Sequence, residues 1–323
     1  MKNIMHYRSV ADMNEVILRG LHRVPQDVDL VVGIPRSGLL AATLVSLYLN
    51  RPLMDLQGLR DNRLLGKGKR EIPGYGASTI AEARRILVVD DCVSKGDELR
   101  RAKAFVDDLG YGEKTLYLTV FSFQENPHLA DITLQIVPRD MFFQWSFMHT
   151  PQLENYCLDI DGVICRDAKK SEDDDGPNYL RFLREASPLF VPTAEVGWLV
   201  TSRLEKYRAE TEEWLTRHGV RFRELIMMDL PSKEAREASR SQASYKAQAY
   251  RRTGAKVFIE SCPVLSEKIA KEAGLPVLCL TSNRVIGNPD LEWISTRRRQ
   301  LRKFSGCVKR LPRWLFSKML GLK

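Results

Sequence analysis

Two pairs of aspartates stand directly after apolar runs of strand length, and the spacing within the pairs differs. In "RILVVDDCVSKGDEL", Asp90 and Asp91 are adjacent. In "YCLDIDGVICRD", one residue separates Asp159 from Asp161. Carboxylates accept hydrogen bonds from hydroxyl groups, attack phosphorus as nucleophiles and transfer protons. The two pairs therefore mark two places for chemistry on a phosphorylated, hydroxyl-rich substrate.

The turn after the first pair, Ser94-Lys95-Gly96, has the composition of a phosphate site. A turn between a strand and a helix presents free backbone N–H groups to an anion. Gly96 lets the backbone approach the ligand closely, and Ser94 and Lys95 supply further donors. Two acids beside a phosphate suit a ligand with vicinal hydroxyls, because a carboxylate accepts hydrogen bonds from a diol. The stretch therefore predicts a site for ribose 5-phosphate.

This stretch resembles the phosphoribosyl pyrophosphate (PRPP) motif of type I phosphoribosyltransferases. "VVGIPRSGLLAA" (31–42) is similar to the pyrophosphate loop of that family, and "RDNRLLGKGKREIPGYG" (60–76) stands where the family has a loop that closes over PRPP. The family's Thr-Gly-x-Thr turn is altered here, since Glu98 replaces a hydroxyl donor. The resemblance implies that PRPP is bound by Arg36, Ser37, Gly38, Lys67, Lys69, Arg70, Asp90, Asp91, Ser94, Lys95 and Gly96.

An aromatic run, "MFFQWSF" (141–147), resembles the segment that forms part of the acceptor hood in some members of this family. A plainer interpretation of the first motif also exists. The adjacent acids could end a Rossmann-like strand and cap the helix that follows. Two motifs in the family's order, with a basic loop between them, favour PRPP binding over that interpretation.

The second pair, spaced D-x-D-G, suits phosphoryl transfer. Asp159 at the strand tip can attack phosphorus, and Asp161 in the next loop can serve the leaving oxygen as acid and then base. Gly162 permits a sharp turn, and too few residues follow it before the next strand for a large cap domain. The stretch resembles the first motif of the haloacid dehalogenase (HAD) phosphatases. An open site of this kind is expected to admit a bulky substrate.

Three later residues follow the HAD order: Thr201 in "WLVTSR", Lys246 in "SYKAQAYRRTG" and Glu260 in "VFIESC". The resemblance implies that Thr201 binds the phosphoryl oxygens and that Lys246 neutralises the aspartyl phosphate. It also implies a Mg²⁺ ion held by Asp159, the carbonyl of Asp161 and Glu260. The catalytic set is thus Asp159, Asp161, Thr201 and Lys246. The alternative is a domain that has lost its activity and serves as a scaffold.

Apolar runs alternate with amphipathic stretches in both halves of the chain, which favours an α/β protein with two mainly parallel sheets flanked by helices. The expected strands of the first half are Leu30–Val32, Pro52–Asp55, Ile86–Val89, Thr115–Phe121 and Ile132–Val137. Those of the second half are Tyr156–Asp159, Gly197–Val200, Leu225–Met228, Lys256–Ile259 and Pro276–Cys279. We expect a type I phosphoribosyltransferase domain over 1–150, a HAD-like phosphatase domain with a minimal cap over 151–290, and a tail over 291–323.

The formal net charge of +9 comes from the tail, since 297–323 holds ten Lys/Arg and no Asp/Glu. Cations interleaved with Leu, Phe and Trp are typical of segments that lie on anionic membranes. Packing on the protein itself or an oligomer contact is the alternative, and no nucleic acid is expected because no recognised module surrounds the tail. The N-terminus has no signal-peptide pattern, which predicts a cytoplasmic protein, peripheral at the inner face of the membrane.

The two resemblances together predict a bifunctional enzyme. The first domain transfers 5-phosphoribosyl from PRPP to a glycan hydroxyl, and the second removes the 5-phosphate to leave ribofuranose, as in bacterial surface polysaccharide biosynthesis. Mg²⁺ is expected in both steps, and a lipid-linked glycan is the expected acceptor. Asp91, Asp61 and Asp140 remain equal candidates for the general base. The alternatives are a nucleobase phosphoribosyltransferase of nucleotide salvage fused to a nucleotidase-like or regulatory HAD phosphatase, and a domain that only senses PRPP.

Overall fold

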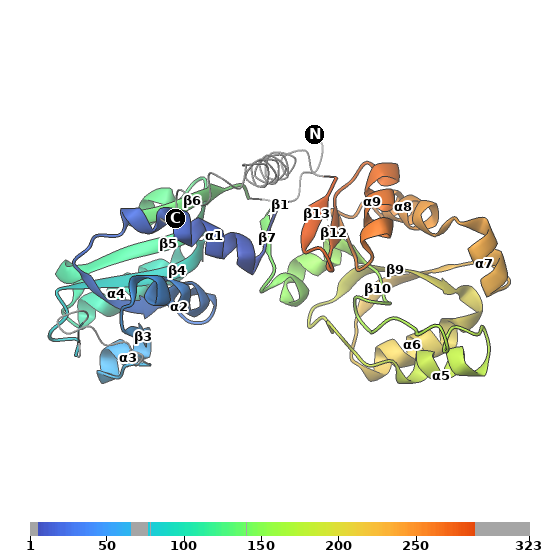
Figure 1. Ribbon diagram of the computed structural model, residues 1–323, viewed down its shortest axis with the longest axis horizontal. Coiled ribbons are helices and arrows are strands. Elements are labelled where there is room, and N and C mark those ends of the chain that lie inside the picture. The colour runs from blue at the N-terminus through green and yellow to red at the C-terminus, as the bar shows by residue number, and fades with distance from the viewer. Residues whose placement is uncertain (1–5, 66–76, 78, 140, 288–323) are drawn as a thin grey trace, which may run out of the picture. The chain divides into compact units, whose positions relative to one another are not determined.

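The computed structural model describes residues 6–65, 77, 79–139 and 141–287 of the chain (Figure 1). Its residues divide into two compact units, His6–Phe147 and the part that begins at Met148. Each unit contains its own sheet and its own apolar core. The units are therefore described one at a time.

The first unit is built on a parallel five-stranded sheet of order β3-β2-β4-β5-β6 (Figure 1). Its strands are β2 (Val28–Gly33), β3 (Leu53–Asp55), β4 (Arg85–Val93), β5 (Thr115–Phe123) and β6 (Ile132–Val137). β2 and β4 pair directly although β3 lies between them in the chain, so the strand order reverses at this pair. Ligands of open parallel sheets bind beyond the carboxyl ends of the strands at such a point.

Helices cover both faces of this sheet, because alternate residues of β4 enter two different apolar clusters. Leu87 and Val89 pack with residues of α1 (Val10–Gly20) and α2 (Ser37–Leu49). Ile86 and Val88 pack with residues of α3 (Leu56–Asp61) and α4 (Asp97–Asp108). A separate two-stranded ribbon joins β1 (His6–Arg8) in parallel with β7 (Met141–Phe143). The ribbon brings the aromatic run into the first unit.

The second unit is built on a six-stranded sheet of order β10-β9-β8-β11-β12-β13. Its strands are β8 (Tyr156–Leu158), β9 (Val196–Leu204), β10 (Phe222–Met228), β11 (Val257–Glu260), β12 (Val277–Cys279) and β13 (Arg284–Ile286). All pairs are parallel except that of β13 with β12. The order reverses between β8 and β11, which places the preferred ligand position beyond the ends of these two strands.

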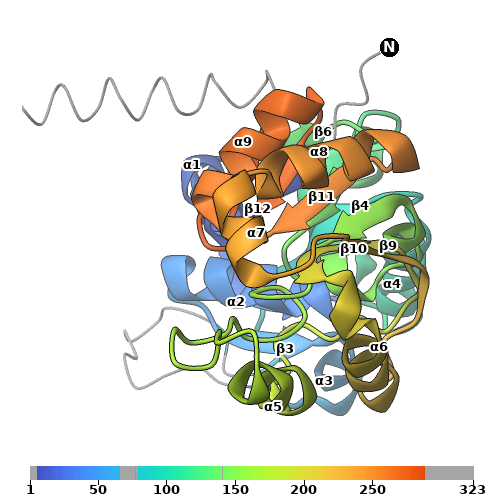
Figure 2. The same ribbon diagram turned by 90° about the vertical axis from the view of Figure 1, so that its right-hand side faces the viewer.

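Two groups of helices accompany this second sheet. Figure 2 shows α8 and α9 together at one side of the unit and α5 with α6 at the other. The helices are α5 (Pro177–Glu185), α6 (Arg208–Arg217), α7 (Lys233–Ser239), α8 (Gln242–Thr253) and α9 (Pro263–Ala273). Short 3₁₀ helices in the two units are Leu21–Arg23, Gly112–Lys114, Pro127–Leu129, Phe147–His149, Pro151–Asn155 and Glu205–Tyr207. No helix of the described ranges is long and apolar enough to cross a membrane.

The expected α/β class, with mainly parallel sheets flanked by helices, is confirmed. Each expected strand overlaps a strand of the structure, but three site residues lie differently from the expectation. β4 continues to Val93, so Asp90 and Asp91 are inside the strand and not beyond its end. Thr201 likewise lies inside β9. Both strands run past their apolar residues because β4 and β9 keep pairing with their neighbours there.

Candidate active sites

The β2–α2 loop and the first residues of α2 lie directly on β4. A Cβ atom on Gly38 would stand 2.9 Å from Oδ1 of Asp90 and 3.0 Å from the carbonyl oxygen of Val89. Contacts this short exclude a side chain, so glycine is what permits the loop to approach the strand. The peptide bond between Pro35 and Arg36 in this loop is cis. The two motifs of the first half are thus in contact at the β2/β4 pair.

Asp91 is the point at which three segments of the first unit meet. Ser37, the first residue of α2, donates its hydroxyl to the Asp91 carboxylate. The indole Nε1 of Trp145 donates to Oδ2 of Asp91 at 2.8 Å. The Trp145 ring stacks on Phe143 at a centroid distance of 4.7 Å, which fixes the indole beside the strand. The aromatic run therefore lies against the acid pair.

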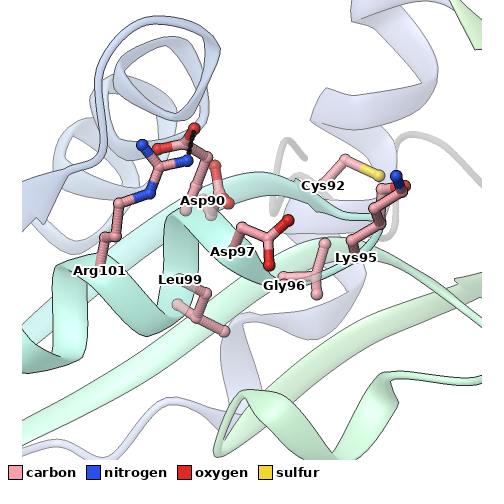
Figure 3. Close-up of a pocket in the computed structure, with 10 residues that line it drawn as sticks. Asp90, Cys92, Lys95, Gly96, Asp97, Leu99 and Arg101 are labelled. Atoms are coloured by element: carbon pink, nitrogen blue, oxygen red, sulfur yellow. Dashed lines mark hydrogen bonds and ion pairs between the residues drawn. The ribbon is translucent and has the colours of Figure 1, made fainter.

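A cavity of about 270 Å³ lies where β4 gives way to α4 (Figure 3). Asp90 and Cys92 of the strand, the turn Ser94-Lys95-Gly96 and the first turn of α4 line it. Gly96 has a φ of +85°, and a Cβ there would overlap Leu129. The left-handed conformation favours glycine at this corner, because other residues are strained there. Asp91 does not line this cavity.

The first turn of α4 faces this cavity with its backbone donors free. Among the described residues, no acceptor takes the amides of Asp97, Glu98 and Leu99. The carboxylates of the same turn are engaged, because Asp97 pairs with Arg100 at 2.7 Å and Glu98 with Arg101 at 2.8 Å. Free amides at a helix start bind anions. The cavity thus combines donors for a phosphate with one carboxylate for hydroxyl groups.

The two acids of β4 are both buried, since Asp90 is 7% and Asp91 5% exposed, and they lie side by side. Burial, and then the neighbouring Asp91 carboxylate, raises the pKa of Asp90 to about 8. Burial also raises the pKa of Asp91, but the hydrogen bonds from Ser37 and Trp145 oppose the increase. At neutral pH the pair therefore holds a proton on Asp90, which makes it both a donor and an acceptor for a diol.

The structure brings together most of the predicted PRPP residues that it describes. Ser37, Gly38, Asp90 and Asp91 meet at the β2/β4 pair, and the turn after β4 lines the cavity. Arg36 is exposed at the loop. Lys67, Lys69, Arg70, Asp140 and the tail over 291–323 lie outside the described residues. Of the general-base candidates, Asp61 is exposed on α3, where it accepts from Gln57, while Asp91 is held by two donors.

In the second unit, Lys246 joins the ends of β8 and β11. Its Nζ lies 2.6 Å from Oδ2 of Asp159 and 2.7 Å from Oε2 of Glu260. All three side chains are buried. Burial lowers the pKa of Lys246, but the two carboxylates outweigh that effect and raise it overall. The lysine is therefore a fixed cation between the two acids.

Backbone donors orient both of these acids. Oδ1 of Asp159 accepts from the amide of Ile160 at 2.9 Å, and Oε1 of Glu260 accepts from the amides of Ser261 and Cys262. Burial raises the pKa of Asp159 well above its usual range, although Lys246 opposes the increase. One oxygen of each carboxylate faces Lys246 and the other is held by backbone. The chain thus positions the acids without help from exposed side chains.

Asp161 has a partner that the sequence analysis did not identify. Arg203, on β9 two residues after the predicted Thr201, donates from Nη2 to Oδ1 of Asp161 at 2.7 Å. The Arg203 side chain is 1% exposed. Thr201 is fully buried, and its hydroxyl accepts from the Arg203 amide at 3.2 Å. The signal in the sequence was the arginine that ends "WLVTSR", two residues after the predicted threonine.

The acids of this site outnumber its cations. Asp167 lies beside Gly162, whose Cβ position would be 2.9 Å from Oδ2 of Asp167, and burial with Asp161 and Glu260 raises the Asp167 pKa. Among the described residues, the four carboxyl groups of this site lie near two cations, Lys246 and Arg203; the carboxyl groups are those of Asp159, Asp161, Asp167 and Glu260. This donor set fits a divalent cation that prefers oxygen ligands.

No three His, Cys, Asp or Glu side chains in the described part of the chain are arranged to hold a metal ion. The predicted Mg²⁺ ligands comprise two carboxylates, Asp159 and Glu260, and the backbone carbonyl of Asp161. That carbonyl lies 3.5 Å from the Ser261 hydroxyl, next to Glu260. The carboxylate of Asp161, by contrast, is taken up by Arg203. The ligand set stays a prediction.

No family model matches the chain, and a comparison with curated protein sequences gives no significant match. Among solved structures, a purine phosphoribosyltransferase from Pyrococcus horikoshii OT3 is 17% identical, covering 44% of this chain and 93% of that chain with a TM-score of 0.32. A xanthine-guanine-hypoxanthine phosphoribosyltransferase from Helicobacter pylori is 20% identical, and the match covers 44% of this chain and 94% of that chain with a TM-score of 0.34. An orotate phosphoribosyltransferase from Aeropyrum pernix is 17% identical, and the match covers 42% of this chain and 72% of that chain with a TM-score of 0.26.

Proposed function

We propose that the chain is a bifunctional enzyme that adds ribofuranose to a glycan in two steps. The first unit transfers 5-phosphoribosyl from PRPP to a glycan hydroxyl, with inversion at the anomeric carbon and release of pyrophosphate. The second unit hydrolyses the 5-phosphate and leaves plain ribofuranose on the acceptor. The observation that carries the first step is the contact of the β2–α2 loop with the acid pair of β4, next to the cavity at α4.

The parts of this first site match the parts of PRPP. The free amides of α4, with Lys95, bind the 5-phosphate at the cavity. Asp90 and Asp91 bind the ribose hydroxyls, for which their shared proton supplies both a donor and acceptors. Arg36 and Ser37 hold the diphosphate beyond β2, and Mg²⁺ accompanies PRPP as part of the substrate. The phosphate, diol and diphosphate groups each have a partner of matching chemistry.

The transfer exchanges one bond to the anomeric carbon for another. The bond to the pyrophosphate oxygen breaks, and its electron pair leaves with pyrophosphate. The acceptor oxygen forms the new bond and loses its proton to a base. Asp91, Asp61 and Asp140 remain the candidates for that base, because a sugar hydroxyl is a weak nucleophile without one.

The second step uses the cluster around Lys246. Asp159 attacks phosphorus through one carboxylate oxygen, and the phosphorus–oxygen bond to ribose breaks as Asp161 gives a proton to the departing oxygen. Water then attacks the aspartyl phosphate, Asp161 takes its proton, and Asp159 is released with phosphate. Thr201 and Lys246 bind the phosphoryl oxygens. A Mg²⁺ ion held by Asp159, Glu260 and the Asp161 carbonyl would supply further charge neutralisation.

The glycan acceptor is inferred from the combination of the two steps. A nucleotide salvage enzyme makes a 5-phosphate that its product needs, so a second step that removes it favours a product with plain ribose. The basic tail over 291–323 supports a site of action at an anionic membrane, where a lipid-linked glycan would be available. We therefore place the enzyme in the cytoplasm, peripheral to the inner face of the membrane.

Pyrophosphate release tests the acceptor class. The protein is incubated with PRPP and Mg²⁺, together with either a membrane glycolipid fraction or a panel of nucleobases. We expect release that depends on the glycolipid, and mass spectrometry should then find ribose on the glycan. Release that depends on a nucleobase would favour a fused salvage enzyme instead. Binding of PRPP with no acceptor-dependent release would favour a PRPP sensor.

A further inference from the structure

The Arg203 guanidinium donates hydrogen bonds to both carboxylate oxygens of Asp161, the second aspartate of the D-x-D pair. Its Nη2 lies 2.7 Å from Oδ1 of Asp161, and its Nε lies 3.2 Å from Oδ1 and 3.1 Å from Oδ2. This fork defines the plane of the carboxylate, as a single-point lysine contact would not. Oδ2 accepts only the Nε bond among the described residues, so it keeps the greater capacity for a further proton or hydrogen bond.

The guanidinium is itself held from several directions. Nη1 donates to the hydroxyl of Thr211 on α6 at 3.4 Å, and Nη2 lies 3.2 Å from Sγ of Cys165. Its carbon lies 5.7 Å from the ring centre of Phe182 on α5. Thr211, Cys165 and Phe182 are all buried. Arg203 therefore has one orientation in which to present its donors.

Stability alone does not explain a buried arginine here. Removing a guanidinium from water carries a large desolvation cost. A buried ion pair with a single carboxylate rarely stabilises the fold more than apolar side chains of the same size would. The Arg203 side chain is 1% exposed, whereas its Asp161 partner is 25% exposed. The buried cation thus serves a carboxylate that still reaches solvent, which is the arrangement of a group that must meet a substrate.

The two aspartates also have separate cations. Lys246 pairs with Asp159, and Arg203 pairs with Asp161. The catalytic scheme gives these acids different tasks, since one attacks phosphorus and the other exchanges a proton with the leaving oxygen. A guanidinium is always charged and never competes for that proton. It also offsets the negative charge that Asp161 gains when the proton departs.

We propose that Arg203 is the positioning residue for proton transfer by Asp161, acting on the orientation and charge of that carboxylate and not on the substrate. This inference rests on the proposed phosphatase step. It follows that Arg203 matters most when the departing oxygen is strongly basic, as in a ribose 5-phosphate ester. A phenolate that leaves easily needs little help from an acid.

The test compares two substrates in the full-length protein with Mg²⁺. Wild type, Arg203→Met, Arg203→Lys and Asp161→Asn are assayed on ribose 5-phosphate and on p-nitrophenyl phosphate. We expect Arg203→Met to lose about 100-fold or more in kcat on ribose 5-phosphate, the scale of general-acid catalysis, and less than about tenfold on p-nitrophenyl phosphate. Asp161→Asn should show the same selectivity, and Arg203→Lys should fall between wild type and Arg203→Met.

Arg252→Met is the matched control, because that arginine is exposed and, among the described residues, its ion pair is with Glu224. It should leave both activities unchanged. If Arg203→Met fails to fold, as judged by thermal unfolding, Arg203→Lys and Asp161→Asn still decide the question. Equal losses on both substrates, or no loss on either, would overturn the positioning role while leaving the phosphatase intact. A wild-type protein inactive on both substrates would remove the phosphatase proposal together with this one.

Discussion

The adjacent acids of β4 differ in what surrounds them. Asp90 lines the cavity, whereas Asp91 accepts hydrogen bonds from Ser37 and Trp145. A carboxylate with two donors is stabilised in its ionised form, so the proton of the pair goes to its neighbour. Sequence reasoning identified the pair and named Asp91 as a candidate base, but it gave no physical difference between the surroundings of the two acids. What separates them is Trp145, 54 positions further along the chain.

Removal of the Trp145 N–H tests this asymmetry. Trp145→Phe keeps an aromatic ring on Phe143 but leaves Asp91 without its 2.8 Å donor. A hydrogen bond to a charged group contributes about 1.5–3 kcal/mol, so we expect PRPP to bind at least about tenfold more weakly by calorimetry. Trp198→Phe, in the second unit, should leave PRPP binding unchanged. Equal affinity in wild type and Trp145→Phe would contradict the assigned role of the indole.

The pH dependence of stability follows from the raised pKa of Asp90, which goes from 3.8 to about 8 because of burial and of Asp91. Between these values the folded chain holds a proton on Asp90 that the unfolded chain has lost. The free energy of unfolding therefore decreases as pH rises through this window, and is lowest above pH 8. This decrease in the free energy of unfolding is expected to be greatest for the protein without bound ligand, in which Asp90 ionises while it is buried.

Asp90→Asn should remove this dependence. We expect scanning calorimetry to show that the first unit of wild type loses about 1 kcal/mol or more of stability between pH 5 and pH 8, relative to Asp90→Asn. The exposed Asp61→Asn should behave like wild type. Parallel stability curves for wild type and Asp90→Asn would mean that Asp90 does not hold a proton in the folded chain.

At the scale of elements, the strands were predictable where apolar runs have ordinary strand length. The three-residue strands β1, β7 and β13 were not predicted, whereas the equally short β3, β8 and β12 were. Pairings across the chain were also beyond pattern reasoning. The contact of Arg203 with Asp161 spans 42 positions and follows from the parallel pairing of β8 with β9. The pairing of Asp159 with Lys246 was expected only through a resemblance.

The approach of the β2–α2 loop to β4 depends on Gly38, which gives a prediction at this scale. Gly38→Ala would place a methyl group 2.9 Å from Asp90 and 3.0 Å from the Val89 carbonyl, so the loop must move away from the strand. We expect PRPP affinity to fall by more than about tenfold, since about 1.4 kcal/mol of lost interaction has that effect. Gly176→Ala is the control, because atoms of Asp174 lie 3.7 Å from its Cβ position, an ordinary van der Waals distance. Unchanged PRPP affinity in Gly38→Ala would show that the loop contact is dispensable.

At the scale of the whole molecule, each unit has its own proposed site at the point where its strand order reverses. The first site lies beyond β2 and β4, and the second beyond β8 and β11. Each proposed site draws its described residues from a single unit. The two steps should therefore be separable by substitution, so that loss of the second leaves the first in operation.

The central claim is that one pentose passes through both reactions, and Asp159→Asn tests it most directly. The variant lacks the proposed nucleophile of the second step but retains the first site. With PRPP, Mg²⁺ and a lipid-linked glycan, mass spectrometry should find phosphoribosyl on the acceptor in Asp159→Asn and ribosyl in wild type. Asp91→Asn, altered in the first site, should modify the acceptor little or not at all. Ribosyl product from Asp159→Asn, or the absence of any phosphorylated intermediate, would contradict the sequential scheme.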